Sequence, residues 1–377
     1  MKGIKYIGPV FDHSGYGEAS RNYVLALSRA GVPVTVQPHC FERNPPPVGS
    51  PADREVLNSL VNNSVDFDVV IIHLTPDLAP AYAHQYPDKH VISYTVWETS
   101  KLHPRWAAAC NHVNEVWVPC DWNVEAFKNS GVTVPVHKIH HGIDTKMYDE
   151  LPKSESAINL EPDTYTFFSV MQWNYRKNPE GLLRSYFNAF TPDEKVRLVL
   201  KAYIGGGQPP NKEAQLIKDV VARIKSDMQL TSFPRVSLIT DTLPSDKLRS
   251  LYRDTDAYVS LSHGEGFGLT MFEAGLAGKP VIATGKGGNM EYMNHENSYP
   301  VPAMWDYVYG MSGFNQWYLG DQQWARPDLV EASKLMRYVF ENREEAAKKG
   351  KVLSDHIKAE FSWDKVAKQM INRLKEL

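Results

Sequence analysis

The chain has 377 residues, of which 42% are hydrophobic and 23% charged, and its formal net charge is −3. This composition excludes a largely disordered protein, and the charge excludes a global attraction to nucleic acid or anionic lipid. No apolar run in the sequence approaches the ~18 residues that span a bilayer. The length predicts two domains, each able to bury its own core.

The start of the chain and its cysteines bear on the compartment. A strand is predicted from Ile4 onward, so we expect no secretory signal and a cytoplasmic protein. Cys40, Cys110 and Cys120 lack the spacing of a metal or redox motif. An odd number of cysteines is typical of a reducing compartment.

In the first half of the chain, short apolar runs alternate with amphipathic stretches, a pattern typical of βαβ units and a parallel sheet. The predicted strands are Ile4–Val10, Val32–Gln37, Asp68–His73, His90–Val96, Glu115–Val118 and Val136–Ile139. Helices are predicted at Glu18–Ala30 and Trp122–Ser130. The polar segment Asp149–Asp163, with two prolines, is predicted to be a linker.

A second alternating series follows this linker. Its predicted strands are Tyr165–Met171, Val196–Tyr203, Arg235–Thr240, Ala257–Leu261 and Pro280–Thr284. Its predicted helices are Pro179–Phe190, Glu213–Met228, Asp246–Arg253 and Leu269–Ala277, followed by a charged helical tail at Asp328–Leu377. We therefore predict an α/β protein with two doubly wound, Rossmann-like domains at residues 1–155 and 156–355, separated by a cleft.

A glycine-rich turn after the predicted strand Ala257–Leu261 is the most informative stretch. Gly264, Gly266 and Gly268 allow the backbone to approach a ligand closely just before a helix begins. The first turn of that helix offers unpaired N–H groups and a partial positive charge, which together bind anions. The turn therefore predicts a diphosphate site.

Glu273 lies on the same predicted helix, beside the apolar stripe formed by Leu269, Phe272 and Leu276. A carboxylate at this position can accept two hydrogen bonds from the vicinal hydroxyls of a ribose. Alternatively, the carboxylate only offsets the helix dipole. The residue alone leaves both interpretations open.

The spacing of Glu265 and Glu273, with seven residues between them, resembles the E-x7-E signature of family-4 retaining glycosyltransferases. The runs 278–284 and 287–291 are similar to that family as well. The resemblance implies a B-type fold of two facing Rossmann-like domains, with a terminal segment, here 356–377, that crosses back to the first domain. It also implies transfer of a sugar with retention of anomeric configuration.

By the same resemblance, Glu265 is expected to contact the transferred sugar and Glu273 the donor ribose. The loop backbone is expected to bind the phosphates. The donor-binding loop residues are then Gly264, Gly266, Phe267, Gly268, Leu269 and Thr270.

Arg176 and Lys177 form a second match to the family. They precede a helix for which Asn178 is the predicted N-cap and Pro179 the first residue. Two cations at a helix start are unfavourable unless an anion binds there. We expect them to stabilise the departing diphosphate, although the family's further upstream arginine is replaced here by Met171-Gln172-Trp173.

Gly15 and Gly17 follow the first predicted strand. The resemblance makes them donor or acceptor contacts, with Tyr16 an acceptor-side candidate; a tight β-to-α turn is the alternative. Ser20 stands where a dinucleotide fingerprint requires glycine, which weakens an NAD-dependent interpretation.

His73, Trp97 and Glu98 stand at the carboxyl ends of predicted strands and are further acceptor-side candidates. Glu98 lies near the position where many members of the family carry a histidine, and it could bind an acceptor hydroxyl or accept its proton. For His73 a structural role is an equal alternative. For Trp97 the alternatives are stacking on a sugar and a place in the core.

We predict no cofactor and no catalytic metal; the donor is expected to be a UDP- or GDP-sugar. Two D-x-D motifs, Asp66–Asp68 and Asp254–Asp256, precede their strands and so lie at the end of the sheet away from a ligand. The lysines 348, 349 and 351 are expected to form a solvated helix face with at most a weak membrane contact.

The acceptor is expected to be a saccharide, a glycolipid or another hydroxyl compound. Two rival functions remain open: a sugar-nucleotide epimerase of the same fold, and a non-catalytic nucleotide or sugar binder. Nucleic acid is not an expected partner, given the net negative charge. The sequence does not indicate an oligomeric state.

Overall fold

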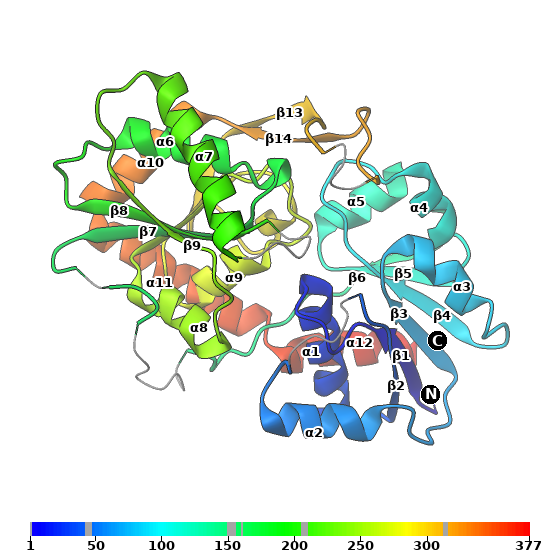
Figure 1. Ribbon diagram of the computed structural model, residues 1–377. Helices are drawn as coiled ribbons and strands as arrows, with labels where there is room; N and C mark the ends of the chain where they lie inside the picture. Colours follow the sequence, from blue (N-terminus) through cyan, green and yellow to red (C-terminus); the bar gives the residue numbers. More distant parts are fainter. Residues whose placement is uncertain (1, 42–46, 149–155, 160, 205–209, 312–315) are drawn as a thin grey trace. The chain divides into compact units, whose positions relative to one another are not determined.

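The computed structural model describes residues 2–41, 47–148, 156–159, 161–204, 210–311 and 316–377 (Figure 1). The chain divides into two compact units: unit 1 comprises Met1–Asp144 with Glu360–Leu377, and unit 2 comprises Thr145–Ala359. Most of the predicted linker, including the predicted boundary at residue 155, lies outside the described residues.

Unit 1 is built on a six-stranded parallel sheet in the order β2-β1-β3-β4-β5-β6. The strands are β1 (Ile4–Gly8), β2 (Val34–Pro38), β3 (Val69–His73), β4 (His90–Tyr94), β5 (Glu115–Val118) and β6 (Val136–Lys138). All six predicted strands of this half are thus confirmed to within a few residues. Their near-continuous apolar sequences fit a sheet covered on both faces.

The helices of unit 1 connect these strands. They are α1 (Gly15–Arg29), α2 (Pro51–Leu60), η1 (Pro76–Leu78), α3 (Ala79–Ala83), α4 (Pro104–Cys110) and α5 (Asp121–Asn129). A last helix, α12 (Trp363–Lys375), returns from the end of the chain and packs along α1 (Figure 1). Its buried side chains Val366, Met370 and Leu374 join the core of unit 1 at helical spacing.

Unit 2 has a second six-stranded parallel sheet, ordered β12-β11-β10-β7-β8-β9. Its strands are β7 (Tyr165–Gln172), β8 (Val196–Tyr203), β9 (Arg235–Ile239), β10 (Ala257–Ser260), β11 (Val281–Thr284) and β12 (Tyr299–Val301). Its helices are η2 (Tyr175–Lys177), α6 (Pro179–Ala189), α7 (Pro210–Met228), α8 (Ser245–Asp254), α9 (Leu269–Leu276), η3 (Gly288–Glu291), α10 (Leu329–Glu341) and α11 (Arg343–Glu360).

A two-stranded antiparallel hairpin, β13 (Ala303–Tyr307) with β14 (Gln323–Pro327), interrupts the second series (Figure 1). The sequence did not predict it. Trp324 of β14 is fully buried in a small separate core with Val308 and Met311. The hairpin is joined to the rest of unit 2 through His263, whose carbonyl accepts from the Ala325 amide at 2.8 Å and whose ring stacks on Trp324.

Each sheet has one point where successive connections reverse direction, and ligands of doubly wound sheets bind there, beyond the carboxyl ends of the strands. In unit 1 this point lies between β1 and β3, and in unit 2 between β7 and β10. The topology therefore selects two pairs of loops, one pair in each unit.

Candidate functional site

The selected loops of unit 2 are the segment from Trp173 to Asn178, after β7, and the segment from Leu261 to Gly268, after β10. Their backbones are joined directly. The amide of His263 donates to the Arg176 carbonyl at 2.7 Å, and the Asn178 Nδ2 donates to the Leu261 carbonyl at 2.9 Å. The strand order thus brings together segments nearly ninety residues apart.

Asn178 fixes the direction in which the first loop enters α6. It adopts a left-handed conformation (φ +50°), and its Oδ1 accepts from the Gly181 amide at 3.0 Å, as predicted for the N-cap. A side chain at Gly181 would place Cβ 2.4 Å from the Asn178 side-chain amide and would displace this cap. The cap holds Arg176 and Lys177 just before the helix.

Both cations converge on Glu265. The Lys177 Nζ lies 2.6 Å from Glu265 Oε1, and the Arg176 Nη1 lies 3.6 Å from Oε2 and 2.6 Å from the Gly264 carbonyl oxygen. The Glu265 residue is only 7% exposed. Burial would raise the pKa of its carboxyl, but Lys177 and Arg176 outweigh burial and hold that pKa below its ordinary value. Two cations against one carboxylate leave a net positive charge.

The glycine loop passes this cluster on the way into α9. Gly268 has φ +85°, and its carbonyl accepts from the Tyr292 hydroxyl at 2.7 Å. The amide of Gly288 donates to the Glu265 carbonyl at 2.8 Å, and a Cβ on Gly288 would lie 2.1 Å from the Gly266 carbonyl oxygen. Close backbone contact, not only flexibility, therefore explains a glycine at residue 288.

Glu273 lies half-buried on α9, one turn after Leu269. Burial and the Glu273 carboxylate together raise the pKa of the Tyr252 hydroxyl, and the same two causes raise that of Tyr148. The Tyr252 ring stacks on Tyr258, with centroids 6.3 Å apart, and the Tyr258 hydroxyl donates to Thr270 Oγ1 at 2.8 Å. The sequence did not indicate these tyrosines, because their partners lie on other elements.

The unit 2 candidates therefore form one neighbourhood on two adjoining segments. Arg176, Lys177 and Glu265 are in direct contact. Residues 264 to 270 form the loop and the first turn beside them. Burial raises the pKa of Tyr258, and the Glu265 carboxylate adds to this rise. Burial and the Glu273 carboxylate have the same effect on the pKa of Tyr252, which stacks on Tyr258.

The unit 1 candidates lie at the carboxyl edge of the first sheet. Gly15 begins α1, and a Cβ on Gly17 would lie 2.3 Å from the Asp12 carbonyl oxygen. The Tyr16 hydroxyl is 2.9 Å from Thr95 Oγ1, and burial and the nearby Glu98 carboxylate raise its pKa. Tyr16 and Glu98 thus belong to one polar group after β1 and β4.

His73 and Trp97 have the surroundings of core residues. The His73 Nδ1 lies 2.6 Å from the Tyr6 hydroxyl, and burial holds the pKa of His73 well below its ordinary value. The indole of Trp97 is buried and donates to Thr99 Oγ1 at 2.6 Å and to the Lys101 carbonyl at 2.9 Å. These contacts account for both side chains without a ligand.

The D-x-D motifs make local contacts at the amino ends of their strands. Asp256 Oδ2 accepts from the Thr166 amide at 2.7 Å, and Asp68 accepts from the Lys2 amide. Within the described ranges, no group of three or more His, Cys, Asp or Glu residues could hold a metal ion. The described helices include none that is long and apolar enough to cross a membrane.

Comparison with known proteins adds a family. Residues 152–301, which contain the whole Arg176–Lys177–Glu265 cluster and Glu273, match the family described as glycosyl transferases group 1. This region of the chain is similar to the group 1 glycosyltransferases.

Relatives of this region are distant. D-inositol 3-phosphate glycosyltransferase 1 of Catenulispora acidiphila is 26% identical over 156 residues, covering 41% of this chain and 36% of that protein. Protein 356 of Sulfolobus islandicus rod-shaped virus 1 is 24% identical over 214 residues, covering 53% of each. The chain thus spans about a third to a half of the length of these relatives.

Solved structures resemble the whole chain, beyond the region that matches the family. Sucrose-phosphate synthase of Thermosynechococcus elongatus has a TM-score of 0.73 at 16% identity, covering 100% of this chain and 99% of its own. HepE of Anabaena, in complex with UDP and glucose, has a TM-score of 0.67 at 14% identity over 100% of both chains. The predicted fold class, that of the B-type glycosyltransferases with two Rossmann-like sheets, is confirmed.

Proposed function

We propose that the protein transfers a sugar from a UDP- or GDP-sugar to a hydroxyl acceptor, with retention of anomeric configuration. The observation that carries this proposal is the cluster of Arg176, Lys177 and Glu265. It lies at the switch point of the second sheet, the place between β7 and β10 where successive connections reverse direction. The acceptor class, as predicted, is a saccharide, a glycolipid or another hydroxyl compound.

The cluster is suited to an anion because it is buried and carries excess positive charge. Water is largely excluded from Glu265, so the cations interact with a bound anion at a lower effective dielectric than in bulk solvent. Arg176 can grip a diphosphate through two N–H groups, while Lys177 acts as a compact point charge. The start of α9, which follows the glycine loop and has no side-chain N-cap, adds backbone N–H groups.

The remaining donor contacts follow from position. Glu273, half-buried on α9, is assigned to the ribose hydroxyls, and Glu265 to a hydroxyl of the transferred sugar. An ionised Glu265, kept so by its two cationic neighbours, accepts hydrogen bonds only. Lys177 therefore fixes both the charge and the orientation of the carboxylate that meets the sugar.

In the proposed reaction, the bond from the anomeric carbon to the β-phosphate oxygen breaks and a bond to the acceptor oxygen forms on the same face of the sugar. The acceptor proton passes to the departing diphosphate. Arg176, Lys177 and the loop amides stabilise the negative charge that develops on that diphosphate. Glu98 and Tyr16 are proposed to position the acceptor within unit 1.

The relatives support this choice of substrates. HepE is described in complex with UDP and glucose and also with UDP-glucose, which supports a nucleoside diphosphate sugar as donor. The Catenulispora acidiphila relative is named for a sugar transfer to an inositol phosphate, which supports a polyol hydroxyl as acceptor.

The test is to incubate the protein with a panel of UDP- and GDP-sugars, with and without saccharide and glycolipid acceptors. Nucleotide release is measured by chromatography, and the linkage of any product by NMR. We expect release that increases with an acceptor, a product that keeps the donor's anomeric configuration, and no loss of rate with EDTA. Donor epimerisation without an acceptor would instead establish an epimerase, and binding without release a non-catalytic protein.

A further inference from the structure

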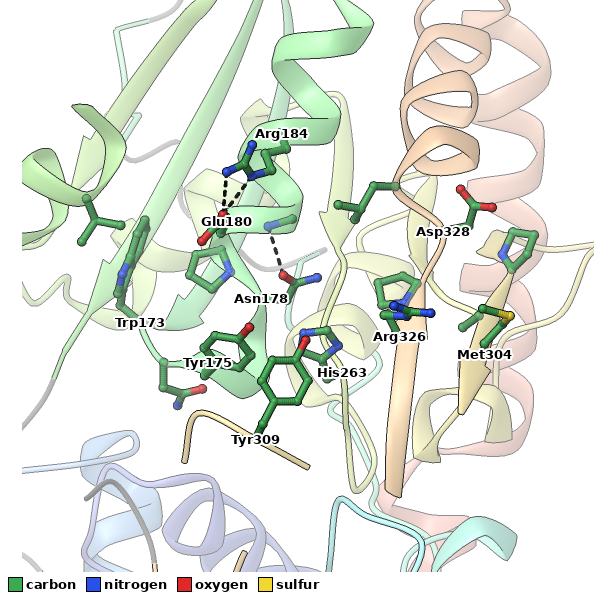
Figure 2. A pocket seen from close by; sticks show the side chains of 18 of the residues that line it. Trp173, Tyr175, Asn178, Glu180, Arg184, His263, Met304, Tyr309, Arg326 and Asp328 are labelled. Carbon is green, nitrogen blue, oxygen red and sulfur yellow. Dashed lines mark hydrogen bonds and ion pairs between the residues drawn. The ribbon is translucent and has the colours of Figure 1, made fainter. Parts of the chain in front are cut away.

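A cavity of about 770 Å³ lies in unit 2, beside the η2 turn (Figure 2). Its walls come from the starts of α6 and α10, from α7, from Tyr175 and His263, and from the β13–β14 hairpin with Tyr309. None of Arg176, Lys177, Glu265 or Glu273 lines it. Tyr175 lines the cavity and directly precedes Arg176, so the two sites share the η2 turn.

One wall of the cavity is aromatic. Tyr175 and Tyr309 pack edge to face with centroids 4.7 Å apart (Figure 2). His263, which also lines the cavity, stacks on the buried Trp324 at 4.9 Å. Tyr175 and Tyr309 are 42% and 44% exposed, so their rings present apolar surface to the solvent. Burial holds the pKa of His263 below its ordinary value, which keeps this wall uncharged near neutral pH.

The other charged lining residues are Glu180, Arg184, Arg326 and Asp328, which are paired or cap a helix, and Arg223 of α7, which adds one cation. Glu180 pairs with Arg184 at 2.8 Å, and Arg326 lies 3.6 Å from Asp306. Asn178 caps α6, and Asp328 caps α10 by accepting from the amides of Val330 and Glu331. The two helix starts that border the cavity therefore have their leading amides satisfied by side chains and do not call for an anion.

We propose that this cavity binds a neutral oligosaccharide, as a subsite for the part of a glycan acceptor that lies away from the reacting hydroxyl. A pyranose ring has one face of C–H groups that packs on an aromatic ring and an edge of hydroxyls that bonds to planar polar side chains. The cavity offers these two surfaces together. Its volume falls in the range of ~300–1,000 Å³ that is usual for small-molecule sites and has room for more than one sugar ring.

The role of the cavity as an acceptor subsite rests on the proposed function, whereas the binding of a saccharide there can be tested independently. Lys177→Ala should lose nucleotide affinity and keep oligosaccharide affinity, whereas Tyr309→Ala should do the reverse. Tyr307 provides a matched control. It lies on β13, two residues before Tyr309, is 61% exposed, and does not line the cavity.

The experiment screens the full chain on an array of neutral and acidic oligosaccharides of two to four residues, then titrates the best binder in solution by calorimetry, with UDP and GDP titrated separately. We expect a neutral oligosaccharide to bind, Tyr309→Ala to weaken it at least tenfold, and Tyr307→Ala to stay within twofold of wild type. UDP or GDP should not displace the saccharide.

Four results would overturn the proposal: retention of acidic glycans only, retention of no glycan, equal affinity in Tyr309→Ala and Tyr307→Ala, or displacement by UDP or GDP. The last would make the cavity part of the nucleotide site. Failure of nucleotide binding by the wild-type protein, with saccharide binding intact, would refute the proposed function and leave the saccharide site standing.

Discussion

The switch points of the two sheets have the same topology and opposite chemistry. In unit 2, the loops after β7 and β10 bring together two cations and one carboxylate. In unit 1, the strands around β1 and β3 end in a buried cluster of Tyr6, Tyr23, Tyr94, His73 and His141. The Tyr23 hydroxyl lies 3.0 Å from His141 Nδ1 and 2.5 Å from the Tyr94 hydroxyl.

Burial acts differently on the two clusters. In unit 1 burial lowers the pKa of His73 and His141 and raises that of the tyrosines, so every member is neutral near pH 7. In unit 2 the mutual attraction of the ions outweighs burial, and Glu265 stays ionised. Equivalent positions in a doubly wound sheet can thus serve either as a neutral scaffold or as an anion site, and the side chains decide which.

The largest expected effect comes from removing charge in unit 2. Lys177→Ala should lower kcat/KM about 10²–10³-fold, because a contact that stabilises the leaving diphosphate is lost. The measurement is initial rate against donor concentration. Lys334→Ala is the matched control, since Lys334 also contacts a glutamate, Glu331, at 2.7 Å but is exposed.

Folding of the lysine variant must be shown by circular dichroism, because its removal leaves Glu265 buried with one cation fewer. If Lys177→Ala does not fold, the same rates are measured on Lys177→Gln, which keeps a polar contact to Glu265. Near-normal turnover in a folded variant would contradict the anion-site interpretation.

A backbone change in the same unit should have the next largest effect. Gly288→Ala forces its Cβ against the Gly266 carbonyl and must shift the donor loop. We expect donor affinity to fall about 10–100-fold, because displacement of such a loop by ~1 Å misplaces its binding groups. Gly320→Ala, where a Cβ meets nothing within 4 Å, should bind the donor like wild type in the same titration.

Unit 1 should be the acid-sensitive half. Burial and then the neighbouring His140 lower the pKa of His141 to about 3, from an unfolded value of about 6.5. The unfolded chain therefore binds more protons below pH 6.5, and stability falls as pH drops from there towards pH 3. Glu265, with its pKa below the ordinary value, contributes stability that is lost only below about pH 4.3.

The check is the melting temperature of wild type, His141→Gln and the exposed-site control His295→Gln between pH 7 and 5. His141→Gln should be less stable at pH 7 but lose on the order of 1–2 kcal/mol less than the other two proteins on going to pH 5. Parallel pH profiles for all three would refute the neutral-scaffold interpretation.

The smallest effect is expected from Glu98→Gln. It keeps the shape of the side chain beside Tyr16 but removes its charge, so KM for the acceptor should rise a few-fold while KM for the donor is unchanged. A change in KM for the donor alone would show that Glu98 does not bind the acceptor.

Much of the fold was predictable because the strands of buried parallel sheets are short apolar runs between helices. The cap at Asn178 and the proline at residue 179 correctly placed the start of α6. The hairpin β13–β14 was missed, since neither strand shows a clear alternation and Trp324 stacks on His263, which lies about sixty residues earlier in the chain. The tyrosines beside Glu273 were missed for the same reason: only the folded chain brings Tyr148 and Tyr252 to α9.

The most direct test of the central claim compares UDP with uridine, and GDP with guanosine, by calorimetric titration of wild type and Lys177→Ala. If Arg176 and Lys177 hold a diphosphate, the nucleotide should bind wild type at least a hundredfold more tightly than its nucleoside. That ratio should fall at least tenfold in the variant. An equal ratio in the two proteins would show that the phosphates bind elsewhere.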